Sequence, residues 1–331
     1  MTAPKEAIIS LTNKCNLKCE MCDIPKGVKD EISTKILKEL IQDLKKINCK
    51  SIVFSGGEPF VRKDVFELIN HSKNNNLKVC ITSNGTLIND EIAQRLAKEG
   101  IGVINISLDG RKKTHDLLRG EGNYDKAIKA LEALKTHHIE TTIATVVCKQ
   151  NYKELPFIIR LARKLGATTV KFQPFNLDFL NDKTRIGQFY ITKKECLELD
   201  RIIKETVALA RKHNININPE TYINKMGLML QNNIKPQTNK GCNALYDTIS
   251  IVNNSDVIPC FPITDKPIGN INKKRFLEIW NSKEHKKIRE NIKKEGCPGC
   301  LMSCYDNNFE TKVGSLKTKF ERLKNAISKF Y

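Results

Sequence analysis

Short apolar, β-branched runs alternate along the first half of the chain with longer segments in which apolar residues recur every three or four positions. The longer segments have the period of amphipathic helices, as Leu37, Leu40 and Leu44 illustrate. The short runs have the length and composition of strands, and they lie at 7–11, 51–55, 77–83, 103–109, 141–147 and 168–174. Six successive strand–helix units predict a parallel sheet, because crossover helices bring successive strands into the same direction.

The number of strands limits how this sheet can close. The units end near residue 173, too early for the eight strands of a closed barrel. We therefore expect an α/β fold built on an open, partial (β/α)6 TIM-like barrel. Chemistry in such folds is concentrated at the carboxyl ends of the strands.

The pattern changes after Pro174. A polar connection over 176–190 leads into a predicted helix over 193–212. From about Gly241 a second region begins, and its stretch DTISIVNNSDVIPC predicts two strands joined by a turn at Asn253, Asn254 and Ser255.

We expect three parts, each with its own pattern. A core barrel covers 1–215, a small second domain covers 216–310, and a basic amphipathic helix covers 311–331. Packing of that helix onto the barrel and docking to an anionic lipid surface are both compatible with its sequence.

Composition narrows the class of protein. The chain has 331 residues, no apolar run of about 18 residues and no secretory signal pattern, so we expect a soluble, cytoplasmic protein. A net charge of +19 favours an acidic partner such as nucleic acid, a phosphorylated substrate or an anionic membrane. A solvated, lysine-rich surface explains the same charge, because the lysines are spread along the whole chain.

Twelve cysteines without an export signal favour metal binding over disulfides, because the cytosol keeps thiols reduced. Cys15, Cys19 and Cys22 follow the first predicted strand with the spacing C-x3-C-x2-C. Three thiolates can hold three irons of a cubane cluster and leave the fourth iron open, whereas a ferredoxin uses four. An open iron can chelate S-adenosylmethionine and deliver the electron that breaks a C–S bond, giving a 5′-deoxyadenosyl radical. A catalytic zinc site with three protein ligands is the alternative, but nothing nearby supplies its usual general base.

The cysteine motif resembles that of the radical S-adenosylmethionine superfamily, and three further segments extend the resemblance: SGGEP after the second strand, ISLDG at the end of the fourth, and HDLLRG behind it. The resemblance implies that the backbone of the glycine-rich segment approaches the methionine amino group, and that a serine and an arginine contact ribose and the methionine carboxylate. An arginine fork matches a carboxylate. Singly, each residue has an ordinary explanation; Asp109, for example, could be a helix cap or a turn former. The residues that the resemblance assigns to S-adenosylmethionine are Gly56, Gly57, Glu58, Ser107 and Arg119.

A second group of cysteines lies in the predicted small domain. The connector IGNINKKRFLEIWNSKEHKKIRENI within this group is similar to that of the SPASM and twitch subfamilies, which implies an auxiliary [4Fe-4S] cluster. The full SPASM pattern has seven cysteines for two clusters, so the five present here imply one, as in the twitch arrangement. We expect Cys242, Cys260, Cys297 and Cys300 as ligands, with Cys304 either replacing Cys300 or remaining a free thiol. A zinc ribbon is the rival interpretation.

These features predict a cytoplasmic enzyme that takes hydrogen from a substrate carbon and receives electrons from a low-potential donor such as flavodoxin or ferredoxin. Oxidation, epimerisation and cross-linking all remain open. We expect the substrate to lie near Gln173, Asn176 and Asp178. The charge favours an anionic small metabolite, and because the first strand is predicted near residue 7 we expect no leader-recognition domain before it. A peptide maturase is the alternative. A zinc-containing nucleic-acid-binding protein is disfavoured, because only 6% of the residues are aromatic and no base-stacking motif is present.

Overall fold

The computed structural model describes residues 4–27, 31–232, 244, 246–261, 267–295 and 300–302. The predicted helix over 311–331 lies outside the described residues. The same holds for three of the predicted ligands, Cys242, Cys297 and Cys304.

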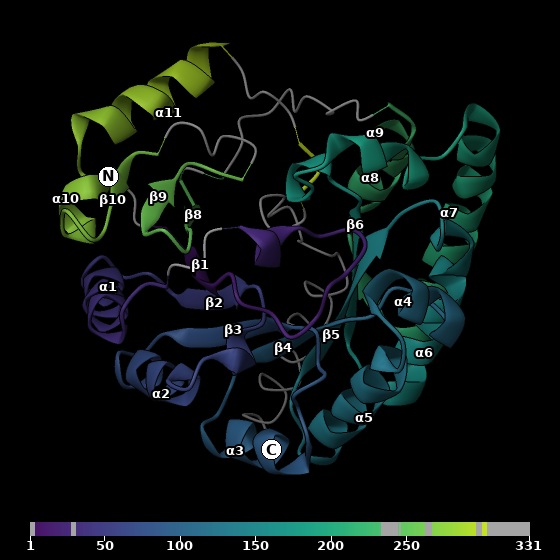
Figure 1. Ribbon diagram of the computed structural model, residues 1–331, viewed down its shortest axis with the longest axis horizontal. Coiled ribbons are helices and arrows are strands. Elements are labelled where there is room, and N and C mark those ends of the chain that lie inside the picture. The colour runs from purple at the N-terminus through teal and green to yellow at the C-terminus, as the bar shows by residue number, and fades with distance from the viewer. Residues whose placement is uncertain are drawn as a thin grey trace, which may run out of the picture.

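A single curved sheet with the strand order β10-β9-β8-β1-β2-β3-β4-β5-β6-β7 forms the centre of the molecule (Figure 1). Its six central strands pair in parallel and in chain order, which confirms the predicted partial barrel. These strands are β1 Glu6–Thr12, β2 Ser51–Gly56, β3 Lys78–Ser83, β4 Val103–Ser107, β5 Thr141–Val147 and β6 Thr169–Pro174.

Helices follow the strands and lie along the outside of the sheet (Figure 1). Side chains of Ser33, Asn89 and Thr192 accept backbone hydrogen bonds at the starts of α1, α3 and α7, as good N-cap residues do. The helices of this layer are α1 Thr34–Lys46, α2 Val65–Asn74, α3 Asp90–Lys98, α4 Lys112–Arg119, α5 Asn123–Thr136, α6 Leu155–Leu165 and α7 Lys193–His213.

Alternation along the strands separates a packed outer face from an open inner face. Phe54, Ile81 and Phe172 are fully buried in the main core. Their neighbours in sequence, Ser55, Thr82 and Gln173, instead line a cavity on the inside, because successive side chains of a strand point to opposite faces. The inner face therefore carries small and polar side chains where a closed barrel would pack branched apolar ones.

The second region continues the barrel sheet and does not begin a sheet of its own. The predicted hairpin is present as β8 Thr248–Ile251 and β9 Asp256–Ile258, and β8 also pairs in parallel with β1. At the opposite edge, the two-residue strand β7 Asn216–Ile217 pairs with β6. Sequence periodicity missed both edge pairings, since they join segments far apart in the chain. The remaining elements are α8 Glu220–Ile223, α9 Met226–Asn232, β10 Gly269–Asn270, α10 Phe276–Trp280 and α11 Lys283–Glu295.

The predicted polar connection over 176–190 contains two short 3-10 helices, η4 Leu177–Phe179 and η5 Lys183–Gln188. Three further 3-10 turns lie elsewhere in the barrel, η1 Ile24–Lys26, η2 Pro59–Val61 and η3 Tyr152–Glu154. In the part of the chain that the structure describes, no helix combines the length and apolar character needed to cross a bilayer.

Candidate cofactor site at the ends of the barrel strands

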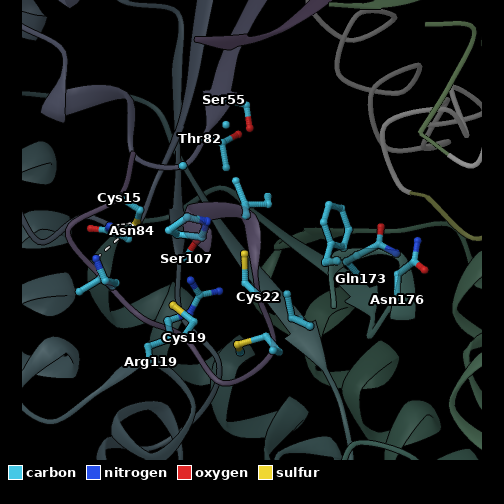
Figure 2. Close-up of a pocket in the computed structure, with 18 of the residues that line it drawn as sticks. Cys15, Cys19, Cys22, Ser55, Thr82, Asn84, Ser107, Arg119, Gln173 and Asn176 are labelled. Carbon is cyan, nitrogen blue, oxygen red and sulfur yellow. Dashed lines mark hydrogen bonds between the residues drawn. The ribbon is translucent and has the colours of Figure 1, made fainter. Parts of the chain in front are cut away.

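A cavity of about 260 Å³ opens at the carboxyl ends of the barrel strands. The three cysteines of the first motif line it, and so do most of the residues predicted to contact S-adenosylmethionine. Figure 2 shows Cys15 and Asn84 on one side of this cavity and Gln173 and Asn176 on the other. Of the predicted residues, the lining includes Cys15, Cys19, Cys22, Gly56, Gly57, Ser107 and Arg119.

The two glycines at the end of β2 allow the loop that carries the cysteines to pass against the strand. The Gly57 N–H donates to the Thr12 carbonyl at 2.6 Å, and the Glu58 N–H donates to the Lys14 carbonyl at 2.9 Å. A Cβ on Gly57 would lie 2.2 Å from the Lys14 carbonyl oxygen, and Gly56 has a φ of +122° that favours glycine. Glycine is therefore required at both positions because the backbone after β2 passes directly against the backbone of the cysteine loop. The sequence pattern alone could not show this contact.

Buried protein groups surround the three thiols. The Sγ of Cys15 lies 3.4 Å from the Leu17 N–H nitrogen and 3.7 Å from the Asn84 side-chain nitrogen, both of which donate to it. Burial raises the pKa of all three thiols, that of Cys22 to about 11. Three sheltered sulfurs around one cavity form a donor set that suits a thiolate-bound metal, which displaces the protons as it binds.

Arg119 reaches the cavity as half of a buried ion pair. Its Nε donates to the Asp109 carboxylate at 2.5 Å, and the other oxygen of that carboxylate accepts from the Val146 N–H at 2.7 Å. Burial opposes the charge of Arg119, but Asp109 and the Cys19 sulfur raise its pKa overall. The sequence suggested a cap or turn role for Asp109; in the structure this fully buried side chain instead orients Arg119 toward the cysteines.

Glu58 differs from the other predicted residues, because its side chain is absent from the described lining of the cavity. It is fully buried, and its carboxylate accepts hydrogen bonds from the Ser83 hydroxyl at 2.9 Å and from the Asn84 and Phe60 N–H groups at 2.7 and 3.2 Å. Glu58 thereby holds the loop after β3. That loop presents Asn84 to Cys15, a contact that sequence reasoning missed and that only the position of Asn84 directly after a strand could have indicated.

The polar connection after β6 forms the wall opposite Cys15. Asn176 and Phe179 line the cavity, whereas Asp178 does not belong to its described lining. Asp23, next to Cys22, fixes this wall by accepting from the Asn181 N–H at 2.9 Å and from Arg185 at 3.1 Å. Arg119 is the one charged side chain among the described lining residues, so the lining itself adds little positive charge to attract the anionic metabolite that the net charge favours.

Two members of the second cysteine group come together beside this wall. Cys260 belongs to a small buried cluster that includes Ile8 and Met302, and the partly buried Cys300 and Phe179 pack against it. Phe179 also lines the cavity, so this one side chain contacts both the cavity and the apolar cluster that holds Cys260. The choice between Cys300 and Cys304 stays a prediction, since Cys304 lies outside the described residues.

Comparison with known proteins identifies the family. The model of the radical SAM superfamily matches residues 9–162, and the model of an iron-sulfur cluster-binding domain, SPASM, matches residues 242–305. An AdoMet-dependent heme synthase of Methanosarcina barkeri is 30% identical over 92% of this chain and 93% of its own length. The chain belongs to the radical SAM superfamily.

Two further comparisons show how the radical SAM chain relates to its relatives. Mycofactocin maturase MftC of Mycolicibacterium smegmatis is 36% identical, but over only 48% of this chain and 41% of that protein. The crystal structure of Streptococcus suis SuiB bound to S-adenosylmethionine has a TM-score of 0.71 at 21% identity, covering 91% of this chain and 72% of SuiB. The likeness to SuiB concerns the fold.

Family membership confirms the predicted enzyme class and its cofactors. A radical SAM enzyme with a SPASM domain uses a [4Fe-4S] cluster, S-adenosylmethionine and auxiliary iron–sulfur chemistry. This finding favours iron over the zinc interpretations of both cysteine groups. The residues that bind each cofactor are assigned below as proposals.

The contact between β2 and the cysteine loop leads to a prediction. Gly57→Ala should force the loop away from the strand and lower the iron and sulfide bound after anaerobic reconstitution, because the new Cβ meets backbone that cannot move alone. Gly187→Ala is the matched control, since a Cβ there has no neighbour within 4 Å. Equal iron and sulfide content in the two variants would show that the loop tolerates the displacement.

Proposed function

We propose that Cys15, Cys19 and Cys22 hold a [4Fe-4S] cluster whose fourth iron binds S-adenosylmethionine. The observation that carries this proposal is that the three cysteines share one cavity whose described lining has no fourth cysteine. When bound, the cluster supplies the electron that cleaves S-adenosylmethionine to methionine and a 5′-deoxyadenosyl radical, which abstracts hydrogen from a substrate carbon. The protein's own residues bind and orient the two reactants and keep water from the radical.

Arg119 and Ser107 are suited to the polar ends of S-adenosylmethionine. The Asp109 carboxylate occupies the Nε of Arg119 and so directs its guanidinium toward Cys19, where a methionine carboxylate would approach the cluster. Ser107, at the end of β4, offers a hydroxyl to the ribose. The N–H groups of Gly57 and Glu58 already donate to the cysteine loop. These two residues can therefore offer only their backbone carbonyls to the methionine ammonium. A carbonyl suits this contact, because it accepts hydrogen bonds and an ammonium donates them.

We propose one auxiliary [4Fe-4S] cluster bound by Cys242, Cys260, Cys297 and Cys300, with Cys304 as the alternative last ligand. Cys260 lies in a small buried apolar cluster and Cys300 packs against that cluster, which supports this proposal. Phe179 lines the cavity and packs against the same apolar residues, which supports a position for the auxiliary [4Fe-4S] cluster beside the substrate, where it accepts an electron from a substrate radical or ligates the substrate.

For the substrate we propose an anionic small molecule, and a carboxylated tetrapyrrole is the first candidate to test. The relative that matches along nearly the whole chain is named a heme synthase, and heme is a macrocycle that carries carboxylates. The apolar wall formed by Met21, Phe175 and Phe179 suits a large, flat, apolar body. A peptide substrate is the second candidate, because MftC, which matches about half of this chain, is named a maturase. A flavodoxin or ferredoxin as electron donor and a cytoplasmic location stay predictions.

Loss of one cluster ligand tests the reaction. Cys19→Ala should retain the fold but abolish cleavage of S-adenosylmethionine to 5′-deoxyadenosine under strong reductant, because two thiolates do not retain the cluster. Cys196→Ala, on the outer helix α7, is the control and should cleave normally. Retained cleavage in Cys19→Ala would refute the assignment of this loop.

Arg119 allows a separate test of cosubstrate binding. Arg119→Ala should weaken binding of S-adenosylmethionine roughly ten- to hundredfold, because a charge-assisted hydrogen bond contributes about 1.5–3 kcal/mol. Arg119→Lys should recover only part of this affinity, since an ammonium lacks the planar fork. The control Arg111→Ala removes a cation stacked on Phe157 and should bind normally. An unchanged dissociation constant in Arg119→Ala would show that Arg119 does not bind S-adenosylmethionine and only pairs with Asp109.

Salt dependence tests the charge of the substrate. Among the described lining residues the one cation, Arg119, is engaged by Asp109, so attraction of an anion has to come from the field of the +19 chain. The screening length falls from about 10 Å at 0.1 M salt to about 3 Å at 1 M. The kcat/KM for a carboxylated tetrapyrrole should therefore fall with salt, while uncoupled cleavage of S-adenosylmethionine changes little. Turnover of a neutral peptide that is insensitive to salt would favour the peptide alternative.

A further inference from the structure

A hydrogen-bond bridge joins the cavity wall to the segment that carries Cys300. The Gln173 side-chain nitrogen donates to the Leu301 carbonyl at 2.6 Å and to the Pro174 carbonyl at 3.2 Å. The Tyr222 hydroxyl lies 3.0 Å from the same Leu301 carbonyl and 3.2 Å from the Gln173 side-chain oxygen. The carbonyl directly after Cys300 is thus held by one donor from the end of β6 and one from α8.

The Tyr222 side of this bridge is buried, and a second contact supports the bridge. Tyr222 is 1% exposed and the Leu301 acceptor is 5% exposed, so water does not replace the Tyr222 hydroxyl, whereas the other donor, Gln173, is partly buried because it lines the cavity. Asn176, from the same cavity wall as Gln173, places its side-chain nitrogen 3.7 Å from the Met302 sulfur. Two amide side chains of the wall therefore hold the two residues that follow Cys300.

The bridge has electrical as well as mechanical consequences. Leu301 directly follows a proposed cluster ligand, Cys300. The partial negative charge on its carbonyl oxygen is stabilised by the hydrogen bonds from Gln173 and Tyr222. Reduction potentials of iron–sulfur clusters depend on the hydrogen bonds and dipoles around their sulfurs. Removing a donor from this carbonyl would alter both the orientation of the peptide dipole and the field at Cys300.

We propose that Gln173 and Tyr222 are positioning residues that fix the Cys300 segment against the substrate cavity and tune the reduction potential of the auxiliary cluster. This inference rests on the auxiliary cluster proposed above. Gln173 has the larger effect, because it makes the shorter bond to Leu301 and also lines the cavity.

The test isolates the auxiliary cluster by changing Cys15, Cys19 and Cys22 together to alanine. In this background, Tyr222→Phe and Gln173→Met should each shift the midpoint potential and the electron paramagnetic resonance spectrum of the reduced cluster, with the larger shift for Gln173→Met. Tyr152→Phe is the matched control. Tyr152 is also 1% exposed, and its hydroxyl donates to Glu198 at 2.7 Å, so the control loses one hydroxyl hydrogen bond without touching Leu301.

A second measurement uses the otherwise unmodified enzyme. Tyr222→Phe should leave uncoupled cleavage of S-adenosylmethionine unchanged but release auxiliary-cluster iron to a chelator about five- to thirtyfold faster, the factor that corresponds to 1–2 kcal/mol. Absence of iron and sulfide in the triple-alanine background would refute the auxiliary cluster and this inference with it. A cluster that is present but has the same potential and spectrum in Tyr222→Phe, Gln173→Met and Tyr152→Phe would refute the inference alone.

Discussion

The close approach of the β2 end to the cysteine loop is the contact on which the rest of the site depends. The loop has to turn immediately after β1 and place three sulfurs over the open end of the barrel. Its Thr12 and Lys14 carbonyls accept hydrogen bonds from the Gly57 and Glu58 N–H groups that follow β2. Any side chain at Gly57 would occupy the position of the Lys14 carbonyl. The position of every sulfur is therefore tied to a backbone contact that side-chain packing elsewhere cannot replace.

Three buried carboxylates extend this frame, each fixing a different wall. Glu58 holds the loop that presents Asn84, Asp109 directs Arg119, and Asp23 anchors the connection after β6. A buried carboxylate is costly unless its oxygens accept hydrogen bonds, and each of these accepts at least two. Breaking one such hydrogen bond leaves a buried carboxylate with an unsatisfied acceptor, which is costly. The carboxylates therefore hold the cavity walls in place, although much of the surface that faces the cavity is apolar.

Local patterns in the sequence predicted the six central strands, because the alternation of Phe54 with Ser55 and of Phe172 with Gln173 follows directly from a sheet with one packed face. They also predicted which cysteines share a loop. The roles of Asp109 and Glu58 could not be read, since a buried carboxylate looks like a cap or a turn residue until its partners from other strands are known. The pairing of β8 with β1 and the bond from Gln173 to Leu301 were beyond reach for the same reason: they join segments more than a hundred residues apart.

The charge distribution of the site separates binding of the cofactor from selection of the substrate. Arg119 is committed to Asp109 and to the cofactor side of the cavity, and the wall toward Cys300 presents Phe179 and the amides of Gln173 and Asn176. Among the described lining residues no second cation is left to neutralise an anionic group inside the cavity. An anionic substrate would therefore keep its charged groups outside, in the field of the basic surface, and insert an apolar part that carries the hydrogen to be removed. In that orientation the apolar part of the substrate would meet the wall that includes Phe179, the side chain that also packs against the cluster holding Cys260.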